Sequence, residues 1–337
     1  MQILENYDLS KLNTFGVSAR ARFFVEIKSI DEVKELFSLS LFKNHSKLFL
    51  GGGSNILFTK DFDGIVVLNS LKGTEIINED NDTVLVHSMG GESWDDLVTF
   101  AVERNFWGIE NLALVPGTVG ASPMQNIGAY GVELKDTLVK VYCIDIDTEN
   151  EVVFDNHECN FGYRDSIFKN EMKDRYFITA IDVLLSKKPN KNIEYKVLKN
   201  YIEEHNLKVE TSKDVSNIVS TIRRSKLPDP KVLGNAGSFF KNVYVEETKF
   251  QELLLKYPEM PFFKEDDKIK IPTAWLIESC GFKGVRFGNV GIHDKQALIL
   301  VNHGGATGLE VKNLAEQIIS AVFKKFGITI SMEVNLI

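Results

Sequence analysis

Two glycine-rich segments give the strongest signs of chemistry in the sequence. Gly51, Gly52 and Gly53 follow a short apolar run, and residues 116–131 hold four glycines and two prolines. Glycine lets the backbone come close to a ligand and turn its N–H groups toward an anion. A GxGxxG motif would need glycine in place of Ile56, and no GxxxxGK[ST] occurs, so neither a Rossmann nor a Walker loop is expected. The two segments together predict two backbone cradles for one extended dinucleotide.

A basic segment near residue 230 could bind a small phosphorylated ligand. Residues 223–241 contain five basic residues (Arg223, Arg224, Lys226, Lys231 and Lys241) against Asp229 alone. Such a cluster is more often a solvated helix end and loop. The run GNAGSFF favours a site, because small residues leave Ser238 accessible and Phe239 and Phe240 could exclude water.

Two more polar residues could take part in chemistry, and each also has a simpler interpretation. Arg164, in GYRDS, could hold a ligand carboxylate or pair with a neighbouring acid. Glu333 lies on the polar face of the last expected strand, where most carboxylates are merely solvated. The six histidines show neither HExxH nor metal-ligand spacing, so no metal site is expected. The sequence lacks GxSxG, which argues against a serine hydrolase.

Composition narrows the class of protein. At 337 residues and 44% hydrophobic content, the chain is long enough for two or three folded domains. No apolar run approaches a membrane span, and Met1 to Lys11 lacks the apolar part of a signal peptide, so we expect a cytoplasmic protein. Its three cysteines form no CxxC pair, which fits a reducing compartment. A net charge of −8 argues against nucleic-acid and anionic-membrane partners.

Apolar periodicity and turn residues predict alternating strands and helices. Strands are expected at residues 23–25, 47–50, 84–86, 139–142, 177–181 and 328–337. Helices are expected from Ser29, which with Glu32 forms a capping box, to about Phe37, after Ser93, over 214–224, and over 311–323 before Gly327. The last helix should bury a stripe that ends in Val322 and Phe323. Two prolines in Leu227-Pro228-Asp229-Pro230 predict a domain boundary there.

Six motifs occur in one fixed order: LGGGSN (50–55), PGTVGASPMQNIGAYG (116–131), GYRDS (162–166), KLPDPK (226–231), GNAGSFFKN (234–242) and the terminal Glu333. Together they resemble the UDP-N-acetylenolpyruvoylglucosamine reductase (MurB) family, from Leu12 to the last strand. The resemblance implies an α+β fold with a two-lobed FAD-binding scaffold, which is not a Rossmann fold, and a third, smaller α+β substrate-binding domain. The lobes would be residues 1–68, which 327–337 could join, and 69–227; the substrate domain would be 228–326.

The same resemblance implies roles for individual residues. Arg164, Ser238 and Glu333 match the catalytic residues of the family. Matches to substrate contacts are Tyr195, Lys226, Asn242, Lys283 and Gln296. The residues expected to hold FAD without a covalent bond are Gly51, Gly52, Gly53, Ser54, Asn55, Pro116, Gly117, Thr118, Gly120, Ala121, Ser122, Gln125, Asn126, Gly128, Tyr130 and Gly131. Tyr195 is the position typical of the branch whose extra loop closes a tyrosine over the substrate. Val243 and Met332 depart from the family, because many relatives have proline at both positions.

The activity implied by the resemblance is reduction of UDP-N-acetylglucosamine enolpyruvate to UDP-N-acetylmuramate, through bound FAD and with NADPH as hydride donor, for peptidoglycan synthesis. Arg164 would hold the substrate carboxylate, Glu333 would stabilise the enolic form, and Ser238 would supply the proton. Two alternatives stay open: another flavin oxidoreductase on the same scaffold, such as an alcohol oxidase, and a non-catalytic UDP-sugar-binding protein. The sequence makes no prediction of oligomeric state.

Overall fold

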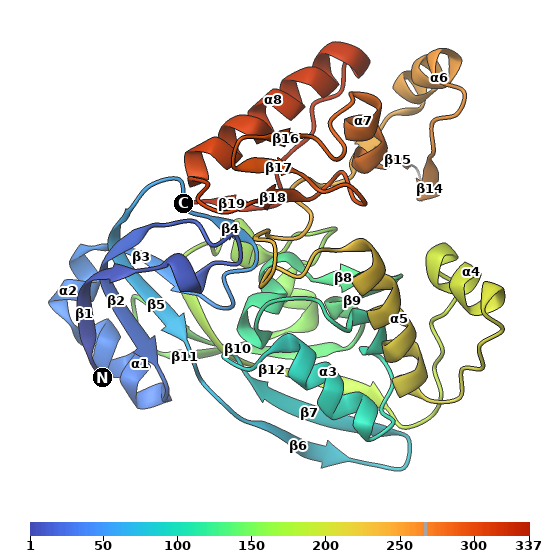
Figure 1. The fold of residues 1–337 in the computed structure, drawn as a ribbon. Helices are drawn as coiled ribbons and strands as arrows, with labels where there is room; N and C mark the ends of the chain where they lie inside the picture. The colour runs from blue at the N-terminus through green and yellow to red at the C-terminus, as the bar shows by residue number, and fades with distance from the viewer. Residues whose placement is uncertain (266–267) are drawn as a thin grey trace. The chain divides into compact units, whose positions relative to one another are not determined.

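A four-stranded sheet begins the fold, in the order β1 (Ile3–Asp8), β2 (Arg20–Ile27), β5 (Phe62–Asn69) and β3 (Ser46–Leu50) (Figure 1). This computed structural model describes residues 1–265 and 268–337. Strands β2, β5 and β3 run parallel. Parallel strands are usually covered on both faces, which explains the buried apolar runs in β2 and β5. The sheet belongs to a first unit formed by residues 1–7, 21–53 and 62–225.

Helix α1 (Ile30–Ser38) follows β2 and begins where the sequence predicts. The Ser29 hydroxyl accepts a hydrogen bond from the Glu32 N–H at 3.2 Å. In the expected capping box, the Glu32 carboxylate would accept a hydrogen bond from the Ser29 N–H. It accepts instead from the N–H of Lys28, one residue earlier, at 2.7 Å. A short helix, α2 (Ser40–Asn44), completes this part of the unit.

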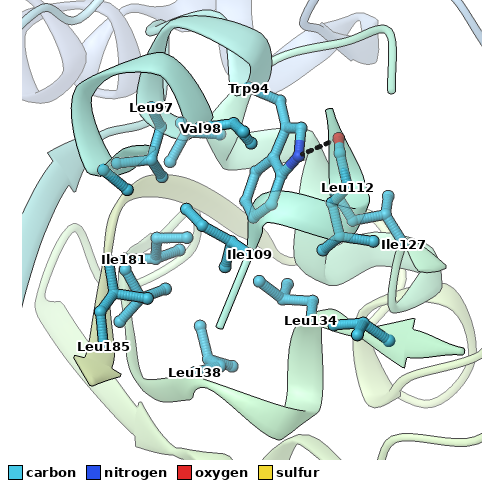
Figure 2. Close-up of a cluster of buried hydrophobic side chains, with 14 of the residues drawn as sticks. Trp94, Leu97, Val98, Ile109, Leu112, Ile127, Leu134, Leu138, Ile181 and Leu185 are labelled. Carbon is cyan, nitrogen blue, oxygen red and sulfur yellow. Dashed lines mark hydrogen bonds between the residues drawn. The ribbon is translucent and has the colours of Figure 1, made fainter. Parts of the chain in front are cut away.

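An antiparallel five-stranded sheet forms the rest of the first unit's framework. Its order is β11 (Glu151–Asp155), β10 (Leu138–Asp145), β12 (Tyr176–Ser186), β7 (Thr83–Met89) and β6 (Thr74–Glu79). Side chains of α3 (Trp94–Glu103) and of β12 pack in one hydrophobic cluster, in which Trp94 Nε1 donates to the Leu112 carbonyl at 3.2 Å (Figure 2). The expected apolar face of α3 is buried, but the Ser93 side chain does not cap this helix.

Five short 3-10 helices lie between α3 and β12 in the chain, and two further α-helices follow β12. They are α4 (Lys196–Glu204), α5 (Ser212–Lys226), η2 (Glu110–Leu112), η3 (Val119–Gln125), η4 (Leu134–Asp136), η5 (Asn156–Cys159) and η6 (Ile167–Lys169), with a two-residue strand pair, β8 (Gly128–Ala129) and β9 (Val132–Glu133). The stripe predicted for α5 is buried: Val215, Ile218, Val219 and Ile222.

The second unit contains residues 8–20, 54–61 and 226–337, of which 266–267 are outside the described residues. Its strands are β13 (Val243–Val245), β15 (Lys268–Ile271) and β14 (Phe263–Glu265) in one sheet, β16 (Arg286–Phe287), β17 (Val290–Ile292) and β18 (Leu300–Asn302) in another, and the parallel pair β4 (Ile56–Leu57) and β19 (Asn335–Leu336). Its helices are η1 (Ser10–Leu12), α6 (Glu247–Lys256), α7 (Thr273–Ser279) and α8 (Gly308–Phe326).

The C-terminal segment corrects one prediction. Only Asn335–Leu336 forms a regular strand, whereas a strand over 328–337 was expected. Ile328, Ile330 and Val334 are buried as the alternation predicts, but Leu336 is exposed. The segment pairs with different partners along its length, with Phe240 through Met332 and with β4 through Asn335, so no single ladder forms.

Helix α8 confirms its predicted position but not every residue of its buried stripe. Thr307 and Glu310 form a reciprocal capping box at its start, and Gly327, with φ +65°, ends it. Phe323 is 55% exposed, whereas Phe326 is buried against Tyr257 and Trp275. The helix therefore buries its last aromatic residue one turn later than predicted.

The α+β class is confirmed, while the division into three domains stays a prediction, since the first unit contains most of both expected lobes. Within the described ranges, no helix has the length and apolar character needed to cross a membrane.

Replacement of Phe326 should test this packing. We expect Phe326→Ala to lower the free energy of unfolding by about 3–5 kcal/mol, because it leaves a cavity between aromatic rings. Phe323→Ala, on the exposed side of the same helix, should change it by less than about 0.5 kcal/mol. Urea denaturation followed by tryptophan fluorescence measures both. Equal losses would contradict the assignment of the buried face.

Candidate functional site

The two glycine-rich segments come together in the first unit. A Cβ atom on Gly52 would lie 3.1 Å from the Gly117 Cα, and one on Gly51 would lie 2.3 Å from Thr118 Oγ1. A Cβ atom at Gly51 would require the Thr118 side chain to move, and one at Gly52 would lie closer to backbone than an ordinary contact, so glycine at both positions lets the two segments lie close together. The structure thus brings Gly51 and Gly52 against residues 117 and 118, as expected for two cradles of one ligand.

The segment 116–131 contains regular structure that the sequence did not reveal. It forms the 3-10 helix η3, a left-handed turn at Asn126 with φ +42°, and strand β8. Three hydrogen bonds of the Asn126 side chain hold this turn. Its Nδ2 donates to the Glu133 carboxylate and to the Gly162 carbonyl, and its Oδ1 accepts from the Lys135 N–H. The loop is therefore held in one shape by its own hydrogen bonds.

Thr118 offers a direct test of whether these residues fit a flavin dinucleotide. Its Oγ1 is buried, and it has no hydrogen-bond partner among residues 1–265 and 268–337. A buried hydroxyl without a partner is unfavourable, and a phosphate or carbonyl oxygen of a ligand would accept its hydrogen bond. A close backbone approach beside an unsatisfied hydroxyl fits FAD.

The other residues expected to contact FAD divide between the units. Ser54 and Asn55 belong to the second unit, where Asn55 Nδ2 donates to the Glu333 carbonyl at 3.3 Å. The remaining ones lie with the glycines in the first unit: Pro116, Gly120, Ala121, Ser122, Gln125, Gly128, Tyr130 and Gly131.

Arg164 has a strained backbone and a fixed side chain. Its φ is +54°, which is unusual for a residue other than glycine and occurs often at functional sites. Its Nη2 donates to the Gly128 carbonyl at 2.7 Å, and its guanidinium lies 5.6 Å from the Tyr163 ring centre. The Arg164 side chain thus contacts the segment 116–131, which is predicted to hold FAD and is called the FAD loop below.

Tyr195 stands at the start of α4 with 47% of its surface exposed. Its ring meets the Tyr130 ring edge to face, with centres 5.7 Å apart. Tyr130 also has a left-handed backbone, with φ +49°, and burial raises the pKa of its hydroxyl. The structure therefore brings the predicted substrate tyrosine to the predicted FAD loop.

Arg223 differs in its surroundings from other residues of the basic segment 223–241, whose role as a phosphate site stays a prediction. It lies in the first unit, where it donates to the Leu114 carbonyl at 3.2 Å, while Lys226, Lys231 and Lys241 belong to the second unit. Burial lowers the pKa of Arg223, and its Nε has no partner among the described residues. Arg223 as a whole is half-buried, whereas Lys226 is exposed.

Ser238 and Glu333 lie on neighbouring segments of the second unit. The Glu333 N–H donates to the Phe239 carbonyl at 2.8 Å, and Lys241 N–H donates to the Ser331 carbonyl at 3.0 Å. Ser238 is exposed in this unit. Phe239 and Phe240 are buried in the core of this unit, and the exclusion of water from the site by their rings stays a prediction. These backbone hydrogen bonds place Ser238 and Glu333 on two neighbouring segments of the second unit.

Three predicted substrate contacts lie in the same unit. Asn242 accepts a hydrogen bond from the Thr273 N–H at 3.1 Å, and Gln296 accepts one from the Leu298 N–H at 3.3 Å. The Leu298 carbonyl in turn accepts from Phe239 N–H, which connects Gln296 to the Ser238 segment. Lys283 forms an exposed ion pair with Glu278 at 2.9 Å, a contact weak enough to be exchanged for a phosphate.

Sequence reasoning missed the buried polar pair Glu110 and Asn111. Both are almost inaccessible to solvent. The Gly108 N–H donates to the Glu110 carboxylate at 2.6 Å, while burial raises the pKa of that group. Asn111 bonds to the backbone of Tyr130 and of Asn192. A signal was present, since two polar residues interrupt an otherwise apolar run from Phe106 to Leu114.

Two family models match the chain. Residues 21–152 match an FAD binding domain, and residues 229–337 match the C-terminal domain of UDP-N-acetylenolpyruvoylglucosamine reductase. A reductase of that name from Flavobacterium johnsoniae is 49% identical over 339 residues and is covered completely, as is this chain. One from Pseudomonas aeruginosa is 42% identical over 337 residues, with 100% of this chain and 99% of the relative covered.

Solved structures agree on the fold. The reductase of this name from Thermus caldophilus gives a TM-score of 0.65 at 21% identity and covers 99% of this chain and 98% of its own. A 6-hydroxy-D-nicotine oxidase from Arthrobacter nicotinovorans gives a TM-score of 0.51 at 14% identity, with 97% and 86% covered. At these identities the likeness concerns the fold alone.

Replacement of Thr118 should separate ligand binding from folding. Thr118→Val keeps the shape of the side chain and removes the buried hydroxyl. We expect the dissociation constant of FAD to rise about tenfold or more, because a hydrogen bond to the cofactor is lost. The apoprotein should be as stable as the parent or slightly more stable. Flavin fluorescence titration and thermal unfolding measure the two effects; unchanged FAD affinity would exclude the contact.

Proposed function

Because the chain belongs to the UDP-N-acetylenolpyruvoylglucosamine reductase family, we propose that Arg164, Ser238 and Glu333 carry the reaction of that family in it. The protein is an FAD oxidoreductase that reduces UDP-N-acetylglucosamine enolpyruvate to UDP-N-acetylmuramate with NADPH, in the synthesis of peptidoglycan precursors. The observation that carries this function is the 49% identity to a curated reductase over the full length of both chains.

Arg164 binds and orients the substrate carboxylate. Residues 51–53 and 116–131 would hold FAD, which would supply hydride transfer from NADPH to the enolpyruvyl group. Addition to the double bond places negative charge beside the carboxylate, so a fixed cation lowers the barrier by stabilising the charge as it develops. The left-handed backbone of Arg164 and its bond to the Gly128 carbonyl support this role, because they hold the guanidinium against the FAD loop.

Ser238 supplies the proton that completes the reduction. A hydroxyl is a weak acid, but a carbon enolate is a strong base, and a cation such as Lys226 or Lys241 would stabilise the resulting alkoxide. Glu333 stabilises the enolic form by hydrogen bonding. The 2.8 Å bond between Glu333 N–H and the Phe239 carbonyl supports joint action, since it fixes the spacing of the two segments.

The UDP-sugar is held by Tyr195 together with Lys226, Asn242, Lys283 and Gln296. Four of these residues lie in the second unit, whose residues 229–337 match the family's C-terminal domain. Tyr195 lies in the first unit and would place the protein in the tyrosine-loop branch of the family. Its exposed ring beside Tyr130 supports a role in closing over the substrate.

We further propose that residues 1–68 and 69–227 are the two lobes around FAD, that 228–326 is the substrate domain, and that the protein acts in the cytoplasm. The matched range 21–152 supports FAD binding by residues of both lobes, and the match of 229–337 supports the substrate domain. The three cysteines, all free thiols, support a reducing compartment.

Ser238→Ala tests the assignment of the proton donor. The variant should fold, bind FAD and have its flavin bleached by NADPH at a near-normal rate, because the hydroxyl has no role in that half-reaction. Turnover with the enolpyruvyl sugar should fall about 10²- to 10⁴-fold. Stopped-flow absorbance separates the two half-reactions.

Ser238→Cys is the matched variant, since a thiol can also donate a proton, and it should recover part of the lost rate. Turnover of Ser238→Ala at the parent rate, with both substrates saturating, would reject Ser238 as the donor and make Glu333 the next residue to replace.

A further inference from the structure

The side chain of Asn111 joins two segments that are far apart in the sequence. It lies in η2 and is fully buried. Burial of an amide is unfavourable unless its groups are hydrogen-bonded. Asn111 Nδ2 donates to the Tyr130 carbonyl at 2.9 Å and to the Asn192 carbonyl at 2.7 Å. The first belongs to the FAD loop and the second to the segment that leads into α4.

The same two segments also contact each other directly, without Asn111. Asn192 Nδ2 donates to the Gly131 carbonyl at 3.3 Å. The Tyr130 and Tyr195 rings meet edge to face, and a Cβ atom on Gly131 would lie 3.7 Å from Tyr195. The end of the FAD loop and the approach to Tyr195 therefore form one connected element, with Asn111 beneath both.

An amide side chain suits the position of Asn111 because its NH2 group can donate to two carbonyls at once. Its Oδ1 accepts no hydrogen bond from any residue that the structure describes. Tyr130 and Gly131 both have left-handed backbones, with φ of +49° and +85°, and such a conformation is unfavourable for tyrosine. A donor fixed beneath the Tyr130 carbonyl helps to hold that turn.

We propose that Asn111 is a positioning residue that sets the place of Tyr195 relative to the FAD loop. This rests on the proposed function, in which residues 116–131 hold FAD and Tyr195 contacts the UDP-sugar. Asn111 acts through the Tyr130 and Asn192 carbonyls. The arrangement links an ordered FAD loop to affinity for the UDP-sugar, and such linkage works equally in both directions.

A double-mutant cycle with Tyr195 tests the proposal in the FAD-loaded protein. Asn111→Leu keeps the approximate volume of the side chain and removes both donors. We expect the KM for UDP-N-acetylglucosamine enolpyruvate to rise about tenfold, as for the loss of two buried hydrogen bonds, with NADPH bleaching within about twofold of the parent rate. Tyr195→Phe should also raise this KM. In the Tyr195→Phe background, Asn111→Leu should raise the KM by less than about twofold, because the group it positions is already gone.

Asn156→Leu is the matched control. Asn156 Nδ2 also bridges two carbonyls, those of Lys135 and Leu138, at 2.7 Å each. Neither residue is a predicted contact of FAD or of the sugar, and Lys135 supports Asn126 through its N–H, not through the carbonyl that Asn156 binds. This variant should leave the KM unchanged. If Asn111→Leu does not fold, Asn192→Ala replaces it in the cycle: it removes an exposed side chain, and should raise the KM about two- to fivefold in the parent only.

Two outcomes would overturn the positioning role and leave the proposed function in place. One is an unchanged KM in Asn111→Leu while Tyr195→Phe raises it. The other is a KM in the double variant that equals the product of the two separate increases. An unchanged KM in Tyr195→Phe would instead reject Tyr195 as a substrate contact, and with it the inference built on that contact.

Discussion

The close approach of Gly52 to Gly117 is the constraint on which the proposed FAD site of the first unit depends. Two backbones approach so closely that a single methyl group on Gly52 would lie 3.1 Å from the opposite Cα. Each segment needs its own support to reach this position. Strand β3 ends directly before Gly51 and so positions the first glycine-rich segment. Helix η3 and the hydrogen bonds of Asn126 hold the second segment, residues 116–131. Thr118, with its buried hydroxyl, lies where the two meet.

The same loop also carries the contacts that concern the substrate. Its far end provides the Gly128 carbonyl for Arg164 and the ring of Tyr130 for Tyr195. Under the proposed function, FAD binding and substrate orientation would share this stretch of backbone in the first unit. In the proposed mechanism the second unit contributes the proton donor Ser238 and the carboxylate of Glu333, which lie on two hydrogen-bonded segments.

Local signals predicted much of this fold and of the candidate site. Ser29 begins α1, the stripe of α5 is buried, and Gly327 ends α8 as their residue types indicate, because capping and amphipathic patterns act within a few residues. Local patterns did not predict the features that depend on contacts between residues far apart in the sequence. Phe326 replaces Phe323 in the core because Tyr257 and Trp275 lie on that side, and the C-terminal strand is divided between two partners. Asn111 was missed because its acceptors are 19 and 81 residues away.

Anaerobic mixing of NADPH-reduced protein with UDP-N-acetylglucosamine enolpyruvate tests the central claim most directly. Flavin absorbance, followed by stopped flow, should return in the absence of oxygen, with stoichiometric formation of UDP-N-acetylmuramate. Reduced flavin that ignores the sugar and is reoxidised only by oxygen would contradict a reductase and indicate an oxidase on the same scaffold. A protein that stays colourless after FAD is added would contradict both and leave a UDP-sugar-binding protein without catalysis.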